Sequence, residues 1–155
     1  MSVGYSGTPL ATKLGIKDGS SVYVLNAPAS YKRMLAPLPP GVSFVKSADR
    51  AHVIHVFTIE KRELQAQLVK LRATMSQDSA LWVSWPKKAS GVATDISEDV
   101  IRAVCLPLGL VDIKVCAVDE TWSGLKLVIR KELRNEAVAL NKVAKKAKST
   151  KSKRA

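Results

Sequence analysis

Two stretches of the 155-residue chain combine charged, hydroxyl and aromatic side chains at spacings that suit ligand chemistry. The first, 87–95, places two lysines, two hydroxyls and an acid in one loop, and the second, 119–124, places two acids, hydroxyls and an indole in another. Cationic and hydroxyl groups hold phosphate or carboxylate through charge-assisted hydrogen bonds. The candidate ligand-binding residues are Lys87, Lys88, Ser90, Thr94, Asp95, Asp119, Glu120, Trp122 and Ser123.

The same lysines also have a structural interpretation. Lys87 and Lys88 would then form ion pairs with acids of the same edge, namely Asp95, Asp119 or Glu120. A general acid or base needs a positioned substrate and a shifted pKa, and the sequence shows neither for the two acids of the second stretch. We therefore assign no catalytic residue and expect a protein that binds an anionic small molecule without transforming it.

Metal and thiol chemistry are not indicated. His52 and His55 are three residues apart on a predicted strand, so they face opposite sides of the sheet. The chain has neither a CxxC nor an HExxH spacing, and we expect no metal ion. Cys105 and Cys116 lie in apolar stretches and suit reduced core thiols of a cytoplasmic protein. Trp122 is interpreted as a lid over the sheet edge or a contact between copies.

The basic charge is concentrated at the C-terminal end. The net charge is +12, and residues 142–155 contribute seven cations and no acid, which leaves +5 on residues 1–141. Residues 135–155 are predicted to be a weakly helical or disordered tail, which either keeps the protein in solution or binds nucleic acid without sequence specificity through counterion release. The seven cations are Lys142, Lys145, Lys146, Lys148, Lys151, Lys153 and Arg154.

The elements that position the candidate residues alternate between strand and helix. Strands are expected at 21–26, 42–45, 52–57 and 80–85, and a terminal antiparallel hairpin at 112–118 and 125–131. Helices are expected at 30–35 and after the capping residues Thr8, Thr58 and Ser97, and the helix after Thr58 should bury Leu64, Leu68, Leu71 and Met75. The 52–57 strand is almost wholly apolar, which is typical of a parallel strand buried on both faces. The order predicts one α/β domain over residues 1–134, with three layers and a mostly parallel sheet. No apolar run approaches the roughly 18 residues of a membrane span, so we expect a cytoplasmic protein with no membrane partner.

This order of elements resembles a reduced Rossmann-like domain of the class I methyltransferase type, from Ser20 to about Lys131. That resemblance implies a glycine-rich turn after the first strand and an acid after the second, which hold S-adenosylmethionine. Here 26–29 has no glycine and Lys46 takes the place of the acid, so we expect no cofactor. An enzyme with a degenerate methyltransferase-like site is the alternative. The stretches 4–10, 85–95 and 115–126 resemble a family of small bacterial proteins of unknown function.

Overall fold

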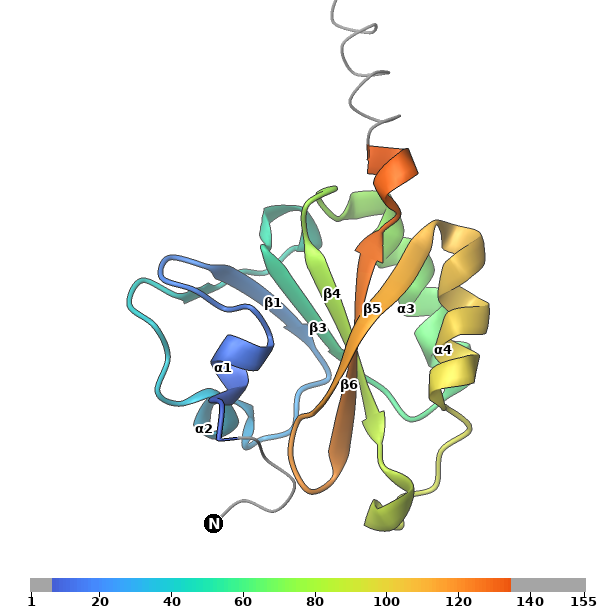
Figure 1. The fold of residues 1–155 in the computed structure, drawn as a ribbon, viewed down its shortest axis with the longest axis horizontal. Helices are drawn as coiled ribbons and strands as arrows, with labels where there is room; N and C mark the ends of the chain where they lie inside the picture. The colour runs from blue at the N-terminus through green and yellow to red at the C-terminus, as the bar shows by residue number, and fades with distance from the viewer. Residues whose placement is uncertain (1–6, 135–155) are drawn as a thin grey trace, which may run out of the picture.

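The computed structural model of the chain describes residues 7–134, so the predicted basic tail lies outside the described residues. Short and long helices alternate with strands along this part of the chain (Figure 1). The elements are α1 (Leu10–Lys13), β1 (Ser21–Leu25), α2 (Tyr31–Leu35), β2 (Ser43–Phe44), η1 (Ala48–Arg50), β3 (Val53–Phe57), α3 (Lys61–Thr74), β4 (Ala80–Pro86), η2 (Lys88–Ser90), α4 (Glu98–Cys105), η3 (Leu106–Leu108), β5 (Leu110–Ala117) and β6 (Trp122–Ile129).

The strands form a mixed six-stranded sheet in the order β2-β1-β3-β4-β6-β5. Strands β2, β1, β3 and β4 are mutually parallel, whereas β6 runs antiparallel to both β4 and β5. The predicted mostly parallel sheet with a C-terminal antiparallel hairpin is therefore confirmed. Because β5 runs in the same direction as β4, the link of the hairpin lies at the same edge as the carboxyl ends of the parallel strands (lower edge of Figure 1).

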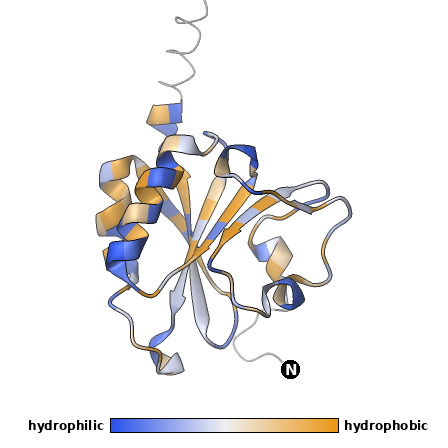
Figure 2. Ribbon diagram, turned by 180° about the vertical axis from the view of Figure 1, so that it is seen from behind, coloured by the Kyte–Doolittle hydropathy of each residue, from blue (hydrophilic) through white to orange (hydrophobic). Residues whose placement is uncertain are grey.

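Helices cover both faces of the sheet, which gives the three predicted layers (Figures 1 and 2). On one face α3 and α4 pack on β3, β4 and β6, and on the other α1 and α2 pack on β1, β3 and β4. All five residues of β3 are buried, as expected for a central parallel strand. The two tryptophans of β4 divide between the faces: Trp82 belongs to the α1–α2 side and Trp85 to the α3–α4 side.

Local signals account for the two longer helices. The predicted apolar face of α3, with Leu64, Leu68 and Leu71, is buried. Helix α4 begins as predicted, because the Ser97 side chain accepts a hydrogen bond from the Val100 N–H at 3.2 Å. No helix within residues 7–134 is long and apolar enough to cross a membrane.

Two helix starts and one strand differ from the expectation. The prediction that Thr8 caps α1 is wrong, since Pro9 occupies the N-cap position and no side chain within residues 7–134 forms a capping hydrogen bond there. Thr58 does not cap α3, whose N-cap residue is Glu60. Strand β2 has two residues and pairs only with the first two residues of β1, because the proline-rich turn before it leaves little extended chain.

Candidate functional site

The candidate residues lie where the parallel strands end, the usual ligand-binding edge of an open α/β sheet. Lys87 follows β4 directly, and its N–H donates to the Thr121 carbonyl at 2.8 Å. This bond joins the loop after β4 to the hairpin link, so the two predicted stretches are brought together. Ser90 does not offer a free hydroxyl there, because its Oγ donates to the Lys87 carbonyl at 2.6 Å and accepts from the Val92 N–H.

Thr94 and Asp95 connect the loop after β4 to the beginning of α3. The Thr94 hydroxyl donates to the Ile59 carbonyl at 2.6 Å. Asp95 Oδ1 accepts from the Lys61 N–H, the first of α3, at 2.7 Å. A carboxylate at this position satisfies an unpaired amide and complements the positive end of the helix dipole. The structure thus gives Asp95 the capping role that the sequence suggested for Thr58.

The hairpin link is shorter than its sequence suggested. Trp122 and Ser123 were expected in the link, but they belong to β6. There they pair with Pro86 and Trp85, respectively. Asp119 Oδ1 accepts from the N–H groups of Thr121 at 2.9 Å and Trp122 at 2.7 Å, which closes the turn. The Trp122 ring forms a T-shaped contact with that of Phe57, with centroids 5.0 Å apart, and packs against the core on the α1–α2 side of the sheet.

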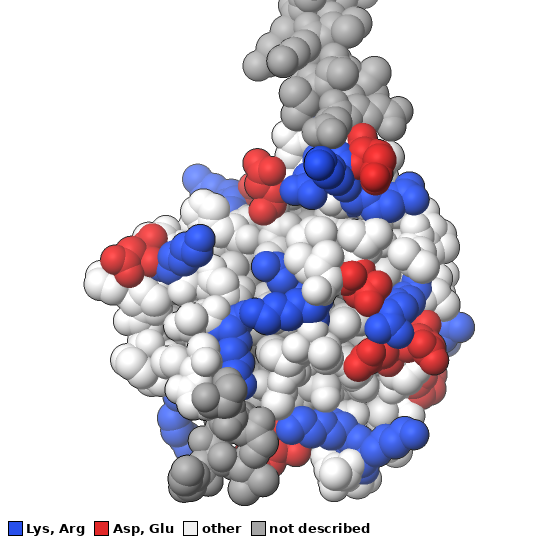
Figure 3. All heavy atoms as spheres, in the orientation of Figure 1, with Lys and Arg blue, Asp and Glu red and all other residues white. Residues whose placement is uncertain are grey.

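In the described part of the chain, Lys87 and Lys88 form no ion pair with a carboxylate. Within residues 7–134 the ion pairs all involve Arg102, which joins Glu98, Asp99 and Asp112. Asp95 and Asp119 bind backbone N–H groups instead of ammonium groups. Lys88 is exposed and Lys87 is half-buried, and cationic side chains lie over η2 at the lower edge of the surface (Figure 3).

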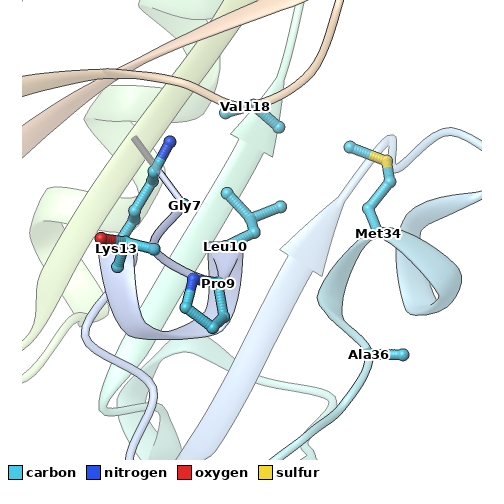
Figure 4. A pocket seen from close by; sticks show the side chains of 8 residues that line it. Gly7, Pro9, Leu10, Lys13, Met34, Ala36 and Val118 are labelled. Carbon is cyan, nitrogen blue, oxygen red and sulfur yellow. The ribbon is translucent and has the colours of Figure 1, made fainter. Parts of the chain in front are cut away.

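A cavity of about 340 Å³ opens beside this edge and was not foreseen from the sequence. Leu10 and Lys13 on α1, Met34 on α2 and Val118 after β5 line it (Figure 4). None of the nine predicted ligand-binding residues is among the lining residues.

Beneath Trp122 a polar chain crosses the core, and sequence reasoning missed it. The Tyr31 hydroxyl lies 2.8 Å from Nδ1 of His55, and Nε2 of His55 lies 2.7 Å from Ser84 Oγ. His55 and Ser84 are fully buried, and burial lowers the pKa of His55 to about 3. The imidazole is therefore neutral, and one of its nitrogens donates while the other accepts. A histidine and a serine in otherwise apolar strands were the available signal.

Neither thiol is poised for nucleophilic chemistry. Burial raises the pKa of Cys105 to about 11, with the Asp112 charge adding to the effect. Burial also raises the pKa of Cys116, although Lys13, Lys114 and Lys87 act in the opposite direction. Both cysteines are free, and no group of three or more His, Cys, Asp or Glu residues in the described part of the chain could hold a metal ion.

The fold is similar to that of class I methyltransferases. A SAM-dependent methyltransferase from Aquifex aeolicus matches with a TM-score of 0.58 and 14% identity, over 78% of this chain and 88% of that one. The mitomycin 7-O-methyltransferase MmcR matches with a TM-score of 0.58 and 11% identity, over 79% of this chain and 53% of that one. A ribosomal protein L11 methylase from Lactobacillus delbrueckii subsp. bulgaricus matches with a TM-score of 0.51 and 8% identity, over 78% of this chain and 75% of that one. No protein-family model and no curated protein matches the chain. The Rossmann-like, methyltransferase-like architecture is thus confirmed at the level of the fold.

Proposed function

We propose that the protein binds a small anionic molecule at the carboxyl edge of its sheet, with Lys87 and Lys88 as the cationic contacts, and that it does not catalyse a reaction there. One observation carries the proposal: within residues 7–134 neither lysine forms an ion pair with Asp95, Asp119 or Glu120. Asp95 and Asp119 accept from backbone N–H groups instead. Ammonium groups at a sheet edge that form no ion pair can bind a phosphate or carboxylate ligand through charge-assisted hydrogen bonds.

The electrostatics of Cys116 support the same location. Lys13, which lines the 340 Å³ cavity, and Lys87, which begins the loop after β4, both act on this thiol. Two cations from different elements therefore lie around one end of the hairpin. The cavity next to them provides room for the uncharged part of a small ligand.

The test is anion binding by lysine variants. Pyrophosphate and inorganic phosphate should raise the melting temperature of the wild-type protein, and Lys87→Ala or Lys88→Ala should weaken binding by about 1–3 kcal/mol for each charge-assisted contact. Lys17→Ala is the matched control, since Lys17 precedes β1 and lies at the opposite edge. The proposal fails if neither anion stabilises the wild type while the two variants lose stability without any ligand, because the lysines are then structural.

A methyltransferase-like enzyme is the second candidate, favoured by the fold alone. At the end of β1, where the family holds its cofactor on a glycine-rich turn, this chain has Asn26, with φ of 59°. The Asn26 amide donates to Glu63 Oε1 at 3.3 Å, so these two groups bind each other. Lys46 and Asp49 follow the two-residue β2 and face α3 instead of the carboxyl edge. Calorimetry with near-millimolar S-adenosylmethionine should show no saturable binding, and binding with one site per chain would favour the enzyme.

A further inference from the structure

Within residues 7–134, the face of β1 that is turned towards α3 has less helical cover than the neighbouring strands. Helices α3 and α4 pack on β3, β4 and β6, while Tyr23 and Leu25 of β1 lie at the margin of this core, beside the three-residue turn η1. As a result, Tyr23 and Leu25 remain half-buried. A groove of about 1000 Å³ lies between them, η1 and the second half of α3, and we call it the β1 groove.

The β1 groove has an apolar floor and a cationic rim. Tyr23, Leu25 and Leu71 contribute apolar surface, and the exposed side chains of Lys46 and Lys70 stand at the opening. Asp49 also lines the groove, and within residues 7–134 none of these three charged groups forms an ion pair. Two cations and one acid leave an excess positive charge beside apolar surface.

A buried acceptor in the same place has no donor within residues 7–134. Gln67 is on the α3 wall of the β1 groove, and none of the described residues donates to its buried Oε1. Buried side-chain oxygens in folded proteins are nearly always paired, with protein or with bound molecules. Because this oxygen has almost no accessible surface, a ligand N–H or O–H group would meet it only after the Gln67 side chain turns into the groove.

We propose that the β1 groove is a second ligand site, separate from the carboxyl edge, for a small amphipathic anion. Such a ligand has a flat apolar body for Tyr23 and Leu25, one anionic group for Lys46 and Lys70, and one donor for Gln67 Oε1. Charge argues against the basic C-terminal segment as the occupant, since residues 142–155 carry seven cations and no acid. The volume suits a small molecule, because ligand pockets span about 300–1,000 Å³.

The probe is 8-anilinonaphthalene-1-sulfonate, which has an aromatic body, an N–H donor and one sulfonate. N-phenyl-1-naphthylamine is its matched control, with the same rings and N–H but no sulfonate. Fluorescence titration of the full chain should show one saturable site for the sulfonate probe. Lys46→Ala and Lys70→Ala should weaken it about tenfold or more, the effect of losing a charge-assisted contact, and leave the uncharged probe unchanged.

Blocking variants test the location. Ala73→Phe, on an exposed position that lines the β1 groove, should abolish binding of both probes, whereas Ala103→Phe, on an exposed position of α4, should not. Lys61→Ala is the charge control on the opposite side of α3. The proposal is overturned if Ala73→Phe binds like the wild type or if Lys87→Ala alone removes binding, which would assign the probe to the carboxyl edge. It is also overturned if Ala73→Phe changes the oligomeric state but not probe binding, since the groove is then an interface between copies.

Discussion

Lowering the pH from 7 to 5 should destabilise the protein by about 2 kcal/mol through His55 alone. Burial lowers the pKa of His55 to about 3 in the native state, while an imidazole in the unfolded chain titrates near 6.5. The neutral ring therefore makes its full contribution to the free energy of unfolding above pH 6.5, and this contribution is lost as the pH falls towards 3. Between pH 7 and 5 the unfolded chain holds on average about 0.7 more protons at this imidazole than the native protein does. At about 1.4 kcal/mol per proton and pH unit, the two pH units cost about 2 kcal/mol.

Urea unfolding at pH 7, 6 and 5 and constant ionic strength measures this loss, and the chain supplies its own control. It has two histidines, and the second, His52, is exposed and accepts from the Ser21 N–H through Nδ1. His52→Gln should keep the pH dependence of the wild type, whereas His55→Gln should be less stable at pH 7 but lose this dependence. If His55→Gln does not fold, NMR titration of wild-type His55 replaces it. The reasoning is refuted if His55 titrates near pH 6.5 in the native protein. It is also refuted if the free energy of unfolding has the same pH dependence in the wild type and both variants.

The remaining predictions concern a glycine, a cap and the C-terminal end. Gly124→Ala would place a Cβ 3.2 Å from Cε3 of the fully buried Trp82, and urea unfolding should show a loss of about 1–3 kcal/mol. Asp95→Ala removes the acceptor for the Lys61 N–H and should cost about 1 kcal/mol by the same measurement, with no loss in Asp78→Ala as control. Ending the chain at Asn141 removes seven cations; the melting temperature should stay the same and salt-sensitive duplex binding should disappear in a filter-binding assay. Duplex binding that is absent in the full chain, or that survives truncation, contradicts the last prediction.

Elements with strong local signals could be predicted because each signal lies within the element itself. The leucine spacing of α3 and the cap of α4 at Ser97 depend on residues at most one or two turns apart. The apolar run of β3 identified a central strand without reference to the rest of the chain. The sheet followed from the order of these elements, because crossover helices connect parallel strands and a short link permits only a hairpin.

The site was less accessible to sequence reasoning, because its contacts join distant parts of the chain. Asp95 caps a helix that begins 34 residues earlier, and no local pattern reports such a bond. The sequence places His55 and Ser84 in mostly apolar strands, but the hydrogen bonds of these buried side chains come from other elements, which a strand pattern does not identify. The β1 groove exists because η1 replaces a helix that a regular βαβ unit would place there, and short segments carry weak signals.

The bonds from Thr94 and Asp95 to the start of α3 also set how readily the loop after β4 can move. Opening this loop breaks two hydrogen bonds, which together contribute on the order of 1–3 kcal/mol, so an open state would hold roughly one molecule in six to one in a hundred and fifty. The first turn of α3 loses its cap in that state, and the Lys61 amide becomes exchange-competent together with the loop. A ligand that favours either position of the loop would therefore change hydrogen exchange at Lys61, even without touching the helix.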